Sequence, residues 1–172
     1  MIRLVGAVIV VAAGTLFGFA QASKYANRPK QIRQLIQALQ RLETEIHYGF
    51  TPLPEALQSL SAQVPEPLAA LFRTASGKLR ETEGMTAAEA IQGAIEEVWT
   101  RTALGKPERQ VVRQLGFTLG ISDRDDQIKH VKLAMNQLQS EEAAAREDQK
   151  RYEAMWKSLG ALGGALVAIL MY

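Results

Sequence analysis

The sequence predicts an all-α protein, a cytoplasmic helical bundle of about six helices flanked by N- and C-terminal transmembrane helices. Apolar residues in its middle recur at spacings of three and four, and alternating runs of β-branched residues are absent. Both ends of the chain carry apolar stretches without a charged residue. We therefore expect one transmembrane helix in residues 1–23, a cytoplasmic helical domain in residues 24–157 and a second transmembrane helix in residues 158–172.

The N-terminal apolar stretch covers residues 4–22 and contains only Thr15 and Gln21 as polar side chains. As a helix it would span about 28 Å, close to the hydrocarbon thickness of a bilayer. Basic residues come directly after it, with no acidic residue before Glu43, and this bias favours a cytoplasmic location for the central region. The basic residues are Lys24, Arg28, Lys30, Arg33 and Arg41.

A cleaved signal peptide is the alternative interpretation of the same stretch. Residues 1–3 resemble a basic n-region, and residues 20–22 resemble a cleavage site with small residues. The length of the apolar run and the basic residues behind it favour an uncleaved anchor instead. Cleavage after Ala22 would leave a secreted helical binding protein.

The C-terminal apolar stretch, residues 158–172, is shorter and would cover about 22 Å as a helix. Trp156 and Tyr172 bracket it as interfacial aromatic residues do, and Lys150, Arg151 and Lys157 precede it. Local thinning of the bilayer or a partner helix would accommodate the short span. A buried helix of the central domain is the alternative.

Each apolar end carries two glycines separated by three residues. They are Gly14 and Gly18 in the first stretch, and Gly160 and Gly164 in the second. This spacing lets two helix backbones approach closely within lipid. The pattern predicts that the two membrane helices pack as a hairpin.

The central region divides into helices at proline, glycine and capping residues. We expect Arg28–Pro29 to interrupt the helix behind the first span, because the residue before proline avoids the helical conformation. An amphipathic helix with apolar residues from Ile32 to Ile46 then ends at Gly49, and Thr51 caps the next helix with Pro52 in its first turn.

Later helices begin near Leu68, at a capping box formed by Thr86 and Glu89, and at Pro107. Ser122 or Asp123 caps the last helix. Neither proline nor glycine occurs between residues 123 and 159, so this helix is expected to run from the domain directly into the membrane.

Catalytic and cofactor motifs are absent from the sequence. Zero cysteines exclude disulfides and thiolate chemistry, two histidines leave little for a metal site, and 20 basic against 18 acidic residues do not indicate nucleic-acid binding. The cluster Asp123, Asp125 and Asp126 lacks the spacing of a calcium loop. We expect no enzyme, no cofactor, no metal and no nucleic-acid partner; a membrane-bound enzyme with an unrecognised site is the alternative.

Several segments together resemble the stage III sporulation protein AB family. The longest is LETEIHYGFTPLPEAL, residues 42–57; Arg28–Pro29, residues 119–123 and the apolar end from Leu159 also match in order and spacing. The resemblance implies a protein of the mother-cell membrane needed for spore development. Residues 49–57 also look like a helix–loop signature of the inner-membrane platform subunit of type II secretion and type IV pilus machines.

By this resemblance the chain is a non-enzymatic platform in a transenvelope, secretion-like complex. The implied partners are the lipid bilayer, a sporulation stage III AA-type ATPase, other membrane proteins of the stage III A complex, and a second copy of the chain. The chain departs from secretion subunits by carrying one helical domain instead of two, so their contact positions do not transfer directly. The partner-binding residues we expect lie around the end of the helix at Tyr48: Glu43, Glu45, Tyr48, Gly49 and Glu55.

Overall fold

The computed structural model describes the backbone of residues 2–48, 51–121 and 123–171. Within these ranges side chains are described for residues 23–48, 51–121, 123–152 and 155. All secondary-structure elements of the described backbone are helices, and no strand occurs in it, which confirms the all-α prediction. The elements are α1 (Ile2–Tyr48), α2 (Leu53–Gln63), α3 (Leu68–Glu81), α4 (Ala87–Val98), the 3₁₀ turn η1 (Trp99–Arg101), α5 (Lys106–Thr118) and α6 (Arg124–Met171).

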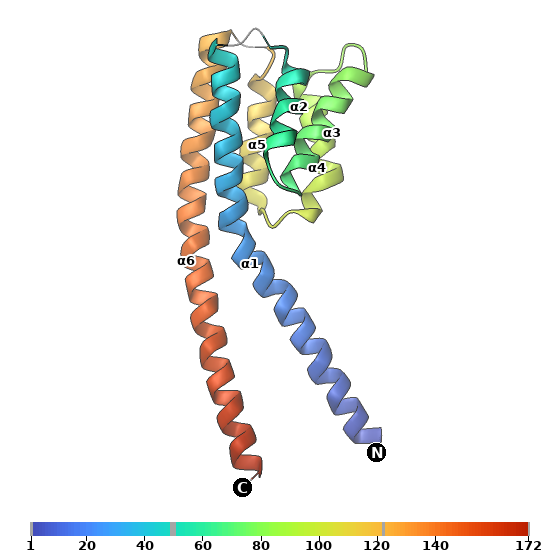
Figure 1. The fold of residues 1–172 in the computed structure, drawn as a ribbon, viewed down its shortest axis with the longest axis vertical. Coiled ribbons are helices and arrows are strands. Elements are labelled where there is room, and N and C mark those ends of the chain that lie inside the picture. The colour runs from blue at the N-terminus through green and yellow to red at the C-terminus, as the bar shows by residue number, and fades with distance from the viewer. Residues whose placement is uncertain (1, 49–50, 122, 172) are drawn as a thin grey trace.

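Two long helices, α1 and α6, form the frame of the molecule (Figure 1). They run antiparallel and side by side along the helical domain, and they diverge toward the two chain ends, which lie at the same end of the molecule. The four shorter helices α2 to α5 lie beside the part of this pair that is farthest from the chain ends; α2 packs against α1, and α5 packs against α6. The chain therefore forms a helical domain from which its first and last helices extend in the same direction.

The core of this domain lies between the short helices and the paired halves of α1 and α6. The apolar positions predicted for the helix from Ile32 to Ile46 face it, and all but the half-buried Ile46 are buried. Each buried aliphatic side chain stabilises the fold by about 1.5–3 kcal/mol relative to an exposed one. The most deeply buried large side chains include Ile32, Leu35, Leu42, Leu57, Leu60, Leu68, Ile95, Leu119, Val131 and Leu138.

The prediction of a helix break at Arg28–Pro29 was wrong. Pro29 lies inside the continuous helix α1. Proline removes one backbone hydrogen bond and crowds the preceding turn, but a helix can bend around it instead of ending. Here Pro29 is buried, and Arg28 beside it is bonded to other helices, so tertiary contacts hold the chain helical on both sides.

The prediction that Thr51 caps the second helix was also wrong. Pro52 occupies the N-cap position of α2 without a side-chain hydrogen bond, and its carbonyl accepts from the amide of Ala56 at 3.0 Å. The Thr51 hydroxyl instead donates to Glu45 Oε2 at 3.1 Å. The threonine therefore ties the connection back to the end of α1 in place of capping α2.

The capping box at the start of α4 is confirmed. The amide of Glu89 donates to Thr86 Oγ1 at 3.2 Å, and the amide of Thr86 donates to Glu89 Oε2 at 2.9 Å. Hydrogen bonds from the Thr86 backbone and hydroxyl lower the pKa of the Glu89 carboxyl. Two orphan amides at the helix start are thus satisfied by one residue pair.

We expect the substitution Thr86→Ala to lower the free energy of unfolding by about 1 kcal/mol, because Glu89 then loses one donor and its own amide loses its acceptor. The pKa of Glu89 should rise toward its ordinary value in a carboxyl-resolved NMR titration. Thr100→Ala is the matched control, since Thr100 is exposed and outside any cap. Equal losses in both variants would contradict the capping role.

The start of α6 is capped as expected at Asp123, whose Oδ1 accepts from the amide of Asp126 at 2.9 Å. Ser122, the other candidate, lies outside the described residues. From this cap α6 continues over 48 residues without a break. Residues 123–159 contain neither proline nor glycine, as the prediction of a continuous helix required, and the helix also runs through Gly160 and Gly164. Gly120, with φ 81°, makes the turn before it in a conformation that an L-residue with a side chain rarely adopts.

Among the side chains that the structure describes, no helix has a stretch long and apolar enough to cross a membrane. Most side chains of the two predicted membrane helices, residues 1–23 and 158–172, lie outside that described set. The same holds for Gly14, Gly18, Gly160 and Gly164, so their predicted packing stays a prediction.

Candidate functional site

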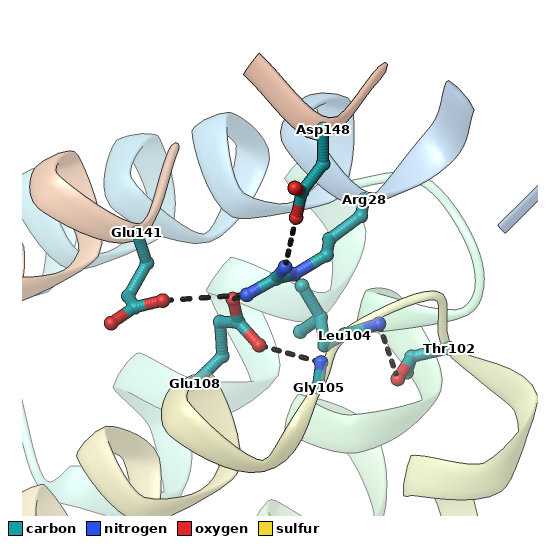
Figure 2. A network of polar contacts seen from close by, with 7 residues as sticks. All are labelled: Arg28, Thr102, Leu104, Gly105, Glu108, Glu141 and Asp148. Atoms are coloured by element: carbon teal, nitrogen blue, oxygen red, sulfur yellow. Dashed lines mark hydrogen bonds and ion pairs between the residues drawn. The ribbon is translucent and has the colours of Figure 1, made fainter. Parts of the chain in front are cut away.

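A partly buried ionic network joins α1, α5 and α6 where the helical domain meets the extended helices (Figure 2). The guanidinium group of Arg28 donates to Glu108 Oε1 from Nη2 at 2.6 Å and from Nε at 3.0 Å. Its Nη2 also reaches Glu141 Oε2 at 3.3 Å, and its Nη1 lies 3.6 Å from Asp148 Oδ2. The side chain of Glu108 is 0% exposed and that of Arg28 is 18% exposed.

Glu108 makes a further contact at the start of α5, and this contact fixes the position of its carboxylate. Its other oxygen, Oε2, accepts from the amide of Gly105 at 2.5 Å and so satisfies the N-cap amide of α5, which is one half of a capping box; glycine has no side chain to supply the other half. The preceding residues are fixed by Thr102, whose hydroxyl accepts from the amide of Leu104, and by Gln31 of α1, which accepts from the amide of Ala103 at 2.7 Å. The connection before α5 is thus bonded directly to α1.

A pair of tyrosines continues the contact toward the chain ends. Tyr152 of α6 donates its hydroxyl hydrogen to the Tyr25 oxygen of α1 at 2.8 Å, and the rings stack with centroids 3.7 Å apart. The hydrogen bond with Tyr152, together with burial, raises the pKa of the Tyr25 phenol. We call Tyr25, Arg28, Glu108, Glu141, Asp148 and Tyr152 the junction.

The contacts of the junction hold α1 and α6 in a fixed orientation relative to the domain. One guanidinium neutralises carboxylates from two other helices, and a planar guanidinium holds carboxylates in defined directions. Its carboxylates are engaged by Arg28 and by a backbone amide. In the described part of the chain, no group of histidine and carboxylate side chains has the arrangement of a metal site. The arrangement therefore orients α1 and α6 relative to the domain.

A second ionic contact ties α1 to α6 further into the domain. Glu142 Oε1 accepts from Arg33 Nε at 2.9 Å and from Arg146 Nη2 at 2.7 Å. Burial by itself would raise the pKa of Glu142, but the hydrogen bonds and charges of Arg146 and Arg33 outweigh it and lower the pKa. These ion pairs explain why an acidic residue occupies this position on α6.

We expect Arg33→Gln to raise the pKa of Glu142 toward its ordinary value in an NMR titration, because one charged donor is removed. A carboxyl with a lowered pKa stabilises the fold above its unfolded-state pKa, and this stabilisation is lost as the pH falls through the folded-state value. Lys129→Gln is the control, since Lys129 pairs with Asp126 instead. An unchanged Glu142 titration in Arg33→Gln would contradict the contact.

Only some of the partner-binding residues predicted from the sequence lie close together in the structure. Tyr48 is 79% exposed at the end of α1, beside the ring of His47. Glu45 accepts from Thr51, and Glu43 pairs with Lys132 of α6 at 3.4 Å. Glu55 belongs to α2 and lies 3.9 Å from Arg80 of α3. Gly49 lies outside the described residues.

No sequence motif pointed to Glu108, which is buried, or to an ionic role for Arg28 within the domain. The signal was present in the helical spacing, because Glu108, Val111, Val112 and Leu115 share one face of α5. The other three are buried core residues. An acidic residue on that face needs a buried partner, and the arginine next to Pro29 supplies it.

The fold and the junction define a class of protein in which an all-α domain is bonded to the paired first and last helices of its own chain. The family model of stage III sporulation protein AB matches residues 3–172. The chain is 44% identical over 171 residues to stage III sporulation protein AB of Bacillus subtilis (strain 168), covering 99% of each. A solved structure of a stage III sporulation protein AB is similar with a TM-score of 0.68 and 43% identity, covering 73% of this chain and 98% of that one.

The chain belongs to the stage III sporulation protein AB family, which gives it a role in sporulation. This confirms the family suggested by residues 42–57 and the other matching segments.

Proposed function

We propose that this chain is a non-enzymatic membrane platform component of a sporulation secretion-like complex. Its two terminal helices anchor it in the mother-cell membrane, its helical domain lies on the cytoplasmic side, and it acts by binding partner proteins that include a stage III AA-type ATPase. Neither a catalytic group nor a cofactor is needed for this role.

The observation that carries the proposal is the shared direction of the first and last helices. Helices α1 and α6 are 47 and 48 residues long and extend toward the same end of the molecule (Figure 1). The charge-free stretches 4–22 and 159–172 form those ends. Two such ends on one side of a domain suit insertion into a single membrane with the domain outside it.

The junction supports the same role mechanically. A platform must present its domain at a defined position relative to the membrane, and the rigid fork of a guanidinium restricts the orientation of its carboxylate partners more than a flexible lysine does. Arg28 makes these contacts five residues beyond Ser23, close to where the apolar stretch ends. The junction thus couples the base of both long helices to the start of α5.

The partner claim is tested by co-purification of the full chain with the stage III AA-type ATPase. Both proteins are expressed together, extracted in mild detergent and isolated through a tag on the chain. We expect the ATPase to elute with it and to do so in the absence of other stage III A proteins. Recovery of the chain in folded form without the ATPase would contradict the partner claim.

A further inference from the structure

The outward face of α5 carries cations without carboxylate partners. Lys106, Arg109 and Arg113 form no ion pair with any residue in the described ranges, although many lysines and arginines elsewhere in those ranges do. Glu108, the helix's one acidic residue, is fully buried on the opposite side. The charged residues of α5 therefore lie on two sides of the helix: the carboxylate faces the interior of the domain, and the cations face outward.

These cations line a hollow on the surface. It measures about 480 Å³ and is lined by Lys106, Arg109, Gln110, Arg113, Gln114 and Phe117. Another part of the Arg109 guanidinium, Nε, is buried and has no hydrogen-bond partner among the described residues. A buried guanidinium donor without an acceptor is unusual in a folded protein.

An apolar surface continues the basic one toward the end of α5. Phe117 is 61% exposed, and Leu133 of α6 is 51% exposed. Gln114 lines both the basic hollow and a smaller neighbouring hollow that Leu133 and His130 also line. The face thus passes from cationic to apolar along a helix that rises about 16 Å between Lys106 and Phe117.

We propose that this α5 face docks an acidic amphipathic helix of a partner protein. Carboxylates of such a helix pair with Lys106, Arg109 and Arg113, and its apolar residues cover Phe117 and Leu133. A helix laid against a helical face in this way uses apolar anchors at intervals of three and four residues, while charge complementarity selects the partner. This assignment rests on the proposed partner-binding function and names the surface that performs it.

A protein segment fits this face better than a lipid surface. Helix α5 packs against α4 and α6 and runs along the long axis of the molecule (Figure 1). If both chain ends enter one membrane, a flat layer of anionic headgroups would reach the Lys106 end of the helix but not Phe117. Only an extended partner that lies along the helix contacts both the basic and the apolar part.

The test measures binding of a fluorescent synthetic helix, with glutamates on one face and leucines on the other, to the full chain in nanodiscs of neutral phosphatidylcholine. We expect saturable binding that weakens at high salt. The variant Lys106→Glu/Arg113→Glu changes two exposed side chains and should weaken binding by at least about tenfold. Phe117→Ala should weaken it by a similar factor without changing its salt dependence.

Lys30→Glu/Lys150→Glu is the matched control, because it reverses the same number of exposed charges away from α5. Equal weakening by both double variants, or by neither, would overturn the assignment. Binding to vesicles of anionic phosphatidylglycerol that depends on Lys106 and Arg113 but not on Phe117 would assign the face to lipid instead. Cross-linking of two chains through α5 without peptide would assign it to a second copy, and either result overturns the proposal.

The peptide assay does not use the ATPase, so the two proposals fail separately. If the ATPase co-purifies but the peptide does not bind α5, the docking surface is wrong and the partner claim stands. If the peptide binds as described but no ATPase co-purifies, the surface stands and its natural partner is another acidic protein.

Discussion

Arg28→Met is expected to lower the free energy of unfolding by about 3–5 kcal/mol, because it leaves the buried carboxylate of Glu108 without its counter-charge. Glu108 is 0% exposed, and its remaining hydrogen-bond donor is the amide of Gly105. Removing one member of a buried ion pair costs more than the pair itself contributes, since the other charge stays desolvated. Urea denaturation of the full chain in mild detergent, monitored by circular dichroism, measures the loss.

The matched control is Arg33→Met, the same substitution five residues further along α1. Arg33 pairs with Glu142 but is 54% exposed, so its removal should cost about 1 kcal/mol or less. The double variant Arg28→Met/Glu108→Gln should be less destabilised than the sum of its single variants, because no unpaired buried charge remains. Strict additivity, or equal losses for Arg28 and Arg33, would contradict the junction.

Leu138→Ala is expected to lower the free energy of unfolding by about 2–5 kcal/mol, the range for removing a large buried aliphatic side chain. Leu138 is 0% exposed on α6 and belongs to the core cluster that includes Ile32 and Leu35 of α1. The substitution leaves a cavity between helices that are fixed in place by the junction, so the site cannot collapse freely.

Leu133→Ala provides the control within the same helix. Leu133 is 51% exposed, and its truncation should change the free energy of unfolding by about 0.5 kcal/mol or less. Under the docking proposal it should instead weaken peptide binding. A large loss of stability in Leu133→Ala together with a small one in Leu138→Ala would show that α6 presents a different face to the core.

The helices could be predicted because their signals are local. The spacing of apolar residues between Ile32 and Ile46 identified the buried face of α1, and the Thr86–Glu89 capping box gave the first turn of α4. The predictions at Pro29 and Thr51 were wrong for the same reason, because they rested on local signals alone. Their local preferences for a break and a cap are weak beside the contacts of Arg28 and the hydrogen bond to Glu45.

The junction could not be predicted because it joins residues far apart in the chain. Arg28 and Glu108 are separated by 80 positions, and Tyr25 and Tyr152 by 127. No local rule pairs them, and only the packing of α6 against both α1 and α5 brings them together. Helical spacing places Glu108 on the apolar face of its helix. A buried partner for Glu108 could therefore be inferred from the sequence, but the identity of that partner could not.

The central claim is that a helical domain stands on the cytoplasmic side of a membrane on its own first and last helices. Single cysteines at residues 3, 137 and 172 test it most directly, because the native chain has none. With a membrane-impermeant maleimide on intact cells, we expect labelling at residues 3 and 172 and protection at residue 137 until the membrane is permeabilised. Labelling at residue 137 in intact cells, or recovery of the chain free of membranes, would contradict the claim.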